Sequence, residues 1–203
     1  MPAAIDVSNM LDFYLCLDMN HDPRANIVRT VTALLDVSPE IDASRVIMTS
    51  PADAWDKGFY LSLVARVRTS LDASKLAWRM RAIETALRDQ QPEPPDSTIN
   101  LAILFALPPD AAAVDAGLLP TKSHVRPIPL ELFDYLGLQC DARSGYLPSG
   151  VDLHIGQAMF GRLPTTLRRD ERNGEVRNAA PYTRSPDESK HLGRLRTGYL
   201  PAG

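Results

Sequence analysis

The chain has 203 residues and a formal net charge of −3, with 44% hydrophobic and 23% charged residues. That composition is typical of a soluble globular protein and excludes a disordered chain dominated by one sign of charge. No segment reaches the roughly 18 uninterrupted apolar residues that cross a bilayer, and no basic stretch followed by an apolar run begins the sequence. We therefore expect a cytoplasmic protein without membrane contacts. Cys16 and Cys140 lie far apart and have no second pair of Cys or His at ligand spacing, so neither a zinc site nor a disulfide framework is expected.

Charge and turn-forming residues divide the chain into two parts. Residues 1–140 carry 12 Lys and Arg against 18 Asp and Glu, whereas residues 141–203 carry 10 against 7. Gly and Pro recur throughout the second part, a pattern typical of irregular structure. We expect one folded domain over residues 1–140 and an irregular, basic extension over residues 141–203 that wraps a protein partner or a second copy of the chain. Its basic residues are spread out and interleaved with acids, which argues against nucleic acid as the partner.

The first half of the domain begins with a strand and a helix. Residues 12–17 alternate between two faces, as a β-strand does. The pair Asp22 and Pro23 is typical of a helix start, where the Asp side chain can cap free N–H groups. Apolar residues then recur at helical spacing from Ile27 to Leu35, and Ser38 with Pro39 ends the helix.

The remaining elements complete a known order. Residues 45–49 and 59–69 are two β-prone runs, and Asp72 can cap a second helix with an apolar stripe from Leu76 to Leu87. Residues 98–106 form a further β-prone run. The order β-α-β-β-α-β predicts an α+β domain of the ferredoxin-like type, with a four-stranded antiparallel sheet and both helices on one face.

Short strings along this order carry a family resemblance. Residues 14–20 stand where the family has a strand ending in Gly-Ser-Asn, and residues 49–51 stand where it has Thr-Pro-Pro. Residues 59–62 resemble its Tyr-Leu-Asn segment, and residues 98–105 resemble its Arg-Thr-Leu-Asp-Leu-Asp-Ile-Leu stretch. Over residues 11–135 the chain thus resembles 6-hydroxymethyl-7,8-dihydropterin pyrophosphokinase, the folate-pathway kinase that transfers a diphosphate from ATP to a pterin. The resemblance implies ligand-binding positions at Asn20, Thr49, Pro51, Tyr60, Ser62 and Glu84.

The chain departs from this family at the positions that carry the chemistry. Two Asp residues on the family's last strand hold the magnesium ions that bridge the ATP phosphates, and Asn100 and Ala102 stand there in this chain. Asp89 and Ser97 stand where the family has phosphate-gripping arginines, and Ser62 replaces the Asn that hydrogen-bonds the pterin. The resemblance therefore implies a relative with no catalytic residues, no metal site and no resident cofactor.

Two of the ligand-binding positions also have a simpler interpretation. Glu84 stands near Arg81 and Arg88 on the second predicted helix, at spacings where side chains pair along a helix. Tyr60 begins a predicted strand, where an aromatic ring commonly packs at the rim of a core rather than stacking on a ligand.

Three functional hypotheses follow from the sequence. The first is a catalytically inactive pyrophosphokinase-like protein that acts as a binding or assembly subunit linked to pterin or one-carbon metabolism. The second is an active pterin diphosphotransferase that uses magnesium and ATP, with replacement carboxylates from Asp18, Asp89 or Asp96. The third is a ferredoxin-like small-molecule sensor in which the resemblance is coincidental.

Overall fold

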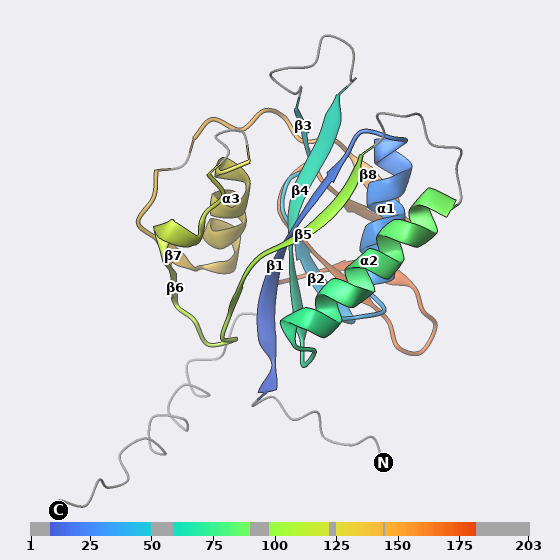
Figure 1. The fold of residues 1–203 in the computed structure, drawn as a ribbon, viewed down its shortest axis with the longest axis horizontal. Coiled ribbons are helices and arrows are strands. Elements are labelled where there is room, and N and C mark those ends of the chain that lie inside the picture. Colours follow the sequence, from blue (N-terminus) through green and yellow to red (C-terminus); the bar gives the residue numbers. More distant parts are fainter. Residues whose placement is uncertain (1–8, 50–58, 90–97, 122–124, 144, 182–203) are drawn as a thin grey trace, which may run out of the picture.

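The computed structural model describes residues 9–49, 59–89, 98–121, 125–143 and 145–181 (Figure 1). Among them are three α-helices: α1 (Pro23–Leu34), α2 (Ala73–Asp89) and α3 (Pro127–Leu136). The strands are β1 (Leu11–Met19), β2 (Glu40–Ala43), β3 (Ile47–Thr49), β4 (Tyr60–Thr69), β5 (Ile99–Leu107), β6 (Ala113–Val114), β7 (Gln139–Cys140), β8 (Leu153–Ile155), β9 (Ala158–Phe160), β10 (Thr165–Arg169) and β11 (Val176–Ala179). None of these helices combines the length and the apolar character that a membrane span needs.

The main sheet is antiparallel and has seven strands. Its order is β11-β10-β2-β4-β1-β5, and β3 pairs with β4 beside β2. The α+β class is therefore confirmed, whereas the expected count of four strands is wrong. One reason is that the strand predicted over residues 45–49 is observed as the short β3, and a second short strand, β2, precedes it. The two strands are separate because Val46 does not pair with β4. It exchanges backbone hydrogen bonds with Gly161 and Val151 instead, at 2.7 and 3.0 Å.

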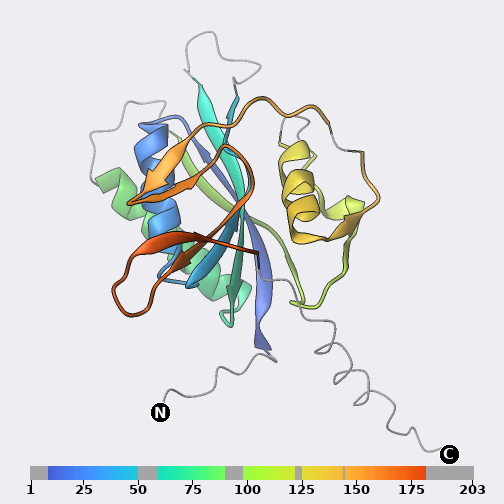
Figure 2. The same cartoon turned by 180° about the vertical axis from the view of Figure 1, so that it is seen from behind.

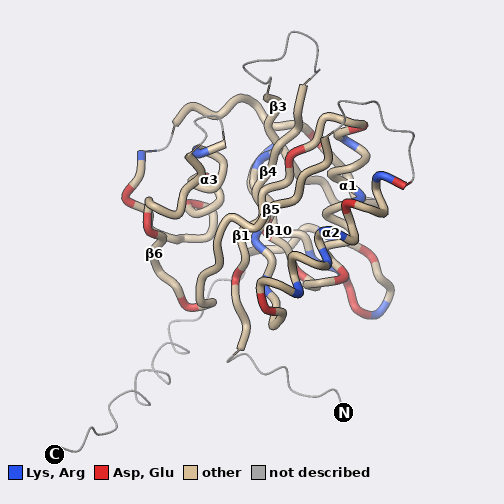
Figure 3. The backbone as a smooth tube through the Cα atoms, in the orientation of Figure 1, with Lys and Arg blue, Asp and Glu red and all other residues tan. Residues whose placement is uncertain are grey.

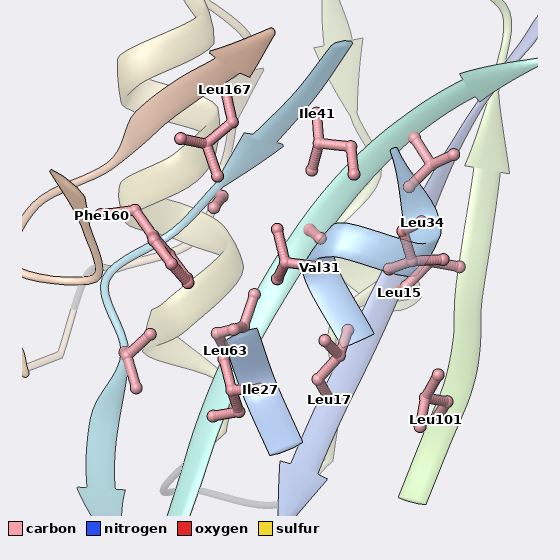
Figure 4. Close-up of a cluster of buried hydrophobic side chains, with 14 of the residues drawn as sticks. Leu15, Leu17, Ile27, Val31, Leu34, Ile41, Leu63, Leu101, Phe160 and Leu167 are labelled. Carbon is pink, nitrogen blue, oxygen red and sulfur yellow. The ribbon is translucent and has the colours of Figure 1, made fainter. Parts of the chain in front are cut away.

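Two helices cover one face of this sheet. The odd-numbered residues of β1 point to that face, where Leu15 and Leu17 pack with Ile27, Val31 and their neighbours on α1. Figure 4 shows these side chains meeting between the strands and the helix. The start of α2 agrees with the sequence, because the Lys75 N–H donates to Asp72 Oδ1 at 2.8 Å. The helix α1 also begins at the predicted Asp22 and Pro23, but the Asp22 side chain makes no capping hydrogen bond, and its backbone is left-handed with φ 34°.

A third helix lies on the opposite face, so the expectation of helices on one face only is wrong. Tyr14, from the even-numbered face of β1, stacks on Phe105 with ring centroids 4.7 Å apart and meets the edge of the Phe133 ring of α3 at 5.4 Å. Figures 1 and 2 show α3 across the sheet from α1 and α2. Proline in its first turn and Gly137 at its end, with φ 71°, are typical helix boundaries.

The segment expected to be an irregular extension is largely ordered within the same molecule. Residues 153–179 form β8 to β11, and β10 pairs with β2 so that Leu167 lies opposite Ile41. Phe160 and Leu167 belong to the same core as α1 (Figure 4). Gly156 and Gly174, with φ 59° and 72°, form the turns between these short strands, so the glycines separate strands instead of preventing them. The expectation of irregular structure is thus wrong for residues 153–179, whereas residues 145–152 contain no helix or strand and residues 182–203 lie outside the described part.

Because Tyr14 is buried, we expect the free energy of unfolding to change with pH in the alkaline range. Burial raises the pKa of the Tyr14 hydroxyl above its ordinary value of about 10, because the phenolate would lose its hydration. Above that pH the unfolded chain releases this proton and the folded chain keeps it, so the free energy of unfolding falls as pH rises. We expect a shallower alkaline decline for Tyr14→Phe than for the wild type in urea titrations. Tyr146→Phe, at a 90% exposed position, is the matched control, and equal slopes for all three proteins would contradict the assignment.

Candidate functional site

Three polar residues form a row across neighbouring strands at one end of the sheet. Asp18 of β1 lies opposite Ser62 of β4 on one side and Asn100 of β5 on the other. The Ser62 hydroxyl donates to Asp18 Oδ1 at 2.6 Å. Ser62 is buried, Asp18 is half-buried and Asn100 is exposed, so the row runs from the interior of the sheet to its open edge. It lies on the face that also carries Tyr14 and Cys16.

The two positions that the resemblance assigns to metal ligands belong to this row and its neighbour. Asn100 is paired with Asp18, and Ala102 is paired with Cys16 one step along the same face. Asp18 is the one carboxylate that the described parts of β1, β3, β4 and β5 place at this end of the sheet. Within the described ranges no three or more His, Cys, Asp and Glu side chains gather in a metal-binding group. Among the described residues of this row, a magnesium ion, which prefers several hard anionic oxygens, would find one carboxylate and one amide.

Three further predicted positions lie at the same end of the sheet. Asn20 Oδ1 accepts from the Thr98 N–H at 2.6 Å, and the Asn20 N–H donates to the Thr98 carbonyl at 3.1 Å. The Tyr60 hydroxyl lies 3.4 Å from Thr98 Oγ1, and Thr49 pairs with Tyr60 in the β3–β4 register. The end of β1 and the starts of β4 and β5 meet here because neighbouring strands are antiparallel. The structure therefore gathers Asn20, Thr49, Tyr60 and Ser62, while Pro51 lies outside the described residues.

Glu84 does not join this group. It projects from α2, on the other face of the sheet, and its Oε1 accepts from the Leu101 N–H of β5 at 2.7 Å. One turn later Arg88 donates to the Ile99 carbonyl at 3.1 Å. These two side chains satisfy outward backbone groups of an edge strand that carries no charged residue, which limits pairing with another chain. Glu84 thus has a structural role that neither interpretation of the sequence identified.

Replacing Glu84 is expected to expose part of the β5 edge. Glu84→Ala removes the acceptor of the Leu101 N–H, so this amide should exchange with solvent faster and the free energy of unfolding should fall by about 1 kcal/mol. Glu84→Gln keeps an acceptor and should restore most of the protection. Thr85→Ala, at an exposed neighbouring position on α2, is the control for helix effects. Unchanged exchange of the Leu101 amide in Glu84→Ala, measured by NMR, would refute this role.

A second polar cluster lies on the same sheet face as the row, toward the opposite end of the strands. Arg66, which is 7% exposed, donates through Nε to Asp42 Oδ2 at 2.7 Å and through Nη1 to Asp12 Oδ2 at 3.3 Å. Arg68 donates through Nε to Asp12 Oδ1 at 2.6 Å and through Nη2 to Asp12 Oδ2 at 2.8 Å. Thr166 of β10 donates to the other oxygen of Asp42 at 2.5 Å. Two carboxylates and two guanidinium groups therefore neutralise one another beneath the surface.

The sequence analysis missed this cluster, although one local signal was present. Arg66 and Arg68 stand at alternate positions of β4, on the face opposite to its Leu63 and Val67. A charged stripe on a strand is ordinarily exposed, and only the pairing of β1, β2 and β10 around β4 buries this one. A cavity of about 200 Å³ borders Asp42, Arg66 and Arg68. All four charged groups have partners, and together with Thr166 the cluster connects β1, β2, β4 and β10.

Comparison with known proteins adds no assignment to this geometry. No protein-family model matches the chain, and none of the curated proteins matches it. The resemblance to the pterin pyrophosphokinases therefore stays a prediction from short strings, to be judged on what the site can do.

Proposed function

We propose that this chain is a non-catalytic relative of 6-hydroxymethyl-7,8-dihydropterin pyrophosphokinase, acting as a binding or assembly subunit linked to pterin or one-carbon metabolism. The strand order β5-β1-β4, with β2 and β3 one after the other along the edge of β4 that faces away from β1, supports a ferredoxin-like domain in which β2 and β3 share the place of one strand. The position of α1 and α2 on one face supports the same domain type. That fold hosts many unrelated functions, so the proposal depends on the site and not on the fold.

The row of Asn100, Asp18 and Ser62 is the observation that carries the proposal. Diphosphoryl transfer needs cations to neutralise the ATP phosphates, and magnesium needs anionic oxygens to hold it there. An amide at Asn100 and a methyl group at Ala102 do not supply them, and Asp18, the one carboxylate that the described strands place nearby, already accepts a hydrogen bond from Ser62. The chemistry of these side chains supports loss of phosphate transfer.

The neighbouring positions support retention of a binding function. Asn20 and Tyr60 lie beside Thr98, and Thr49 pairs with Tyr60 at the same end of the sheet; hydroxyl and amide groups of this kind suit the donor and acceptor edges of a pterin ring. In this proposal a pterin contacts these side chains, and the buried Ser62 orients Asp18 beside them through its hydrogen bond. Assembly uses the basic residues 182–203, because residues 145–181 pack on the chain's own sheet.

The release of AMP from ATP tests the non-catalytic part. The purified protein is incubated with magnesium, ATP and 6-hydroxymethyl-7,8-dihydropterin, with an active pyrophosphokinase as the positive control. We expect no AMP above the protein-free background. Repeated turnover would overturn the proposal and favour the transferase alternative, in which Asp18 with Asp89 or Asp96 would have to supply the metal ligands.

A further inference from the structure

A groove of about 710 Å³ runs between α1 and α2 on the outer surface of the helical layer. Its lining is mainly aliphatic: Ala33, Val37, Leu71, Ala82, Ile83 and Ala86. The groove lies across the sheet from the row of Asn100, Asp18 and Ser62, so it is a separate surface from the proposed pterin site.

Small side chains keep this groove open. Ala82 and Ala86 follow each other at i and i+4 on α2, and Ala33 lies on α1 across from them. Methyl groups at these positions leave a depression where longer aliphatic residues would fill the space between two packed helices. A depression with aliphatic walls suits the apolar side chains of another segment laid along the two helices.

The rim of the groove is positively charged. The helices α1 and α2 together contain six Lys and Arg and two Asp and Glu, although the whole chain has a net charge of −3. Figure 3 shows the blue Lys and Arg positions along α2. Glu84 is turned toward β5, and Asp36 at the edge of the groove is paired with Arg169 of β10. Arg29, which lies 3.8 Å from Asp22, and Arg79 are the two cations among the lining residues, against the single carboxylate of Asp36, so the charge of the lining is net positive.

An exposed aromatic residue stands next to this rim. Trp78 of α2 is 64% exposed, and the guanidinium carbon of Arg79 lies 5.6 Å from the centre of its ring. Exposed tryptophan and arginine beside an apolar depression are the residue types that dominate the energetics of protein interfaces.

We propose that this groove binds an acidic amphipathic helix of a partner protein, with apolar side chains in the groove and carboxylates against Arg29 and Arg79. A second copy of this chain fits poorly, because the same basic surface would face itself. Nucleic acid fits poorly too, because an aliphatic groove offers little to phosphates and bases. The inference stands on the groove alone and holds whether or not the chain binds a pterin.

Fluorescence anisotropy with two labelled peptides tests the proposal on the full-length protein. Both are amphipathic helices of about 18 residues with leucines at i, i+3 and i+7 spacing, and one carries Glu and the other Lys on its polar face. We expect saturable binding of the Glu peptide that weakens with added salt, and at least about tenfold weaker binding of the Lys peptide. Equal affinities, or no binding of the Glu peptide, would overturn the proposal. Tighter binding of a single-stranded RNA or of anionic vesicles would overturn it as well.

Variants then locate the binding. Ala86→Phe fills the groove from an exposed position, and Arg79→Glu reverses one rim charge; each should weaken binding of the Glu peptide about tenfold or more. Thr85→Phe and Arg172→Glu make the same changes at exposed positions that do not line the groove, and they should bind as the wild type does. Wild-type affinity in both groove variants would place the peptide elsewhere and refute the assignment.

Discussion

Replacing the buried Arg66 with methionine is expected to lower the free energy of unfolding by about 3–5 kcal/mol, the loss typical of a buried ion pair that loses one partner. Asp42 is 2% exposed and would keep only the Thr166 hydroxyl as a partner, with no cation beside it. Asp12 would keep Arg68. The loss in unfolding free energy therefore comes mainly from the Asp42 carboxylate, which stays charged and buried between β2, β4 and β10.

A double variant distinguishes this cause from a general packing defect. Arg66→Met with Asp42→Leu removes both charges, so it should be more stable than Arg66→Met alone. Arg172→Met, at an exposed turn, is the control and should change stability by less than about 0.5 kcal/mol. Urea unfolding followed by circular dichroism measures all three. Wild-type stability in Arg66→Met would mean that the buried network does not form.

Truncating Phe160 to alanine is expected to cost about 3–5 kcal/mol, because its ring fills the core beneath α1. Phe160 is 1% exposed and belongs to a core cluster whose other members precede residue 102, except for Val151, Leu153, Ala158 and Leu167. Met159→Ala, one residue earlier on β9 and 48% exposed, should change stability by about 0.5 kcal/mol or less. If urea unfolding gave similar values for the two variants, residues 153–179 would not belong to the core of the domain.

Elements encoded by local periodicity could be predicted from the sequence. The alternation of residues 12–17 lies within β1, and the apolar stripe from Leu76 to Leu87 lies within α2. Both signals come from residues close in sequence, and both elements bury one clear face. The order of the first elements along the chain follows from them, which is why the α+β class was accessible without coordinates.

Elements that depend on distant partners could not be predicted. β8 to β11 have three to five residues each, and β10 pairs with a strand that lies more than 120 residues earlier. No local sequence pattern indicates such a distant partner. The frequent glycine and proline were therefore the only local signal, and they indicated irregular structure. In the same way, β2 was not among the predicted strands: it has four residues, and Arg66, the buried partner of its Asp42, is 24 residues away.

In the candidate site, too, some residues could be placed from the sequence and others could not. Asn20, Thr49, Tyr60 and Ser62 lie at one end of the sheet because antiparallel strands bring their ends together, which the strand order alone implies. The contact of Glu84 with the backbone of β5 depends on how α2 sits against an edge strand, and no spacing in the sequence indicates it. The hydrogen bond from Ser62 to Asp18 likewise became visible only with the register of β1 and β4.

Equilibrium binding of 6-hydroxymethyl-7,8-dihydropterin tests the proposed function most directly. Pterin fluorescence is followed during titration of the purified protein, with and without magnesium and a non-hydrolysable ATP analogue. A site with the neutral Asn100 and Ala102 in place of metal ligands predicts saturable pterin binding that the nucleotide does not strengthen. Mutual strengthening of pterin and nucleotide would contradict a non-catalytic subunit, and absence of pterin binding would contradict the link to pterin metabolism.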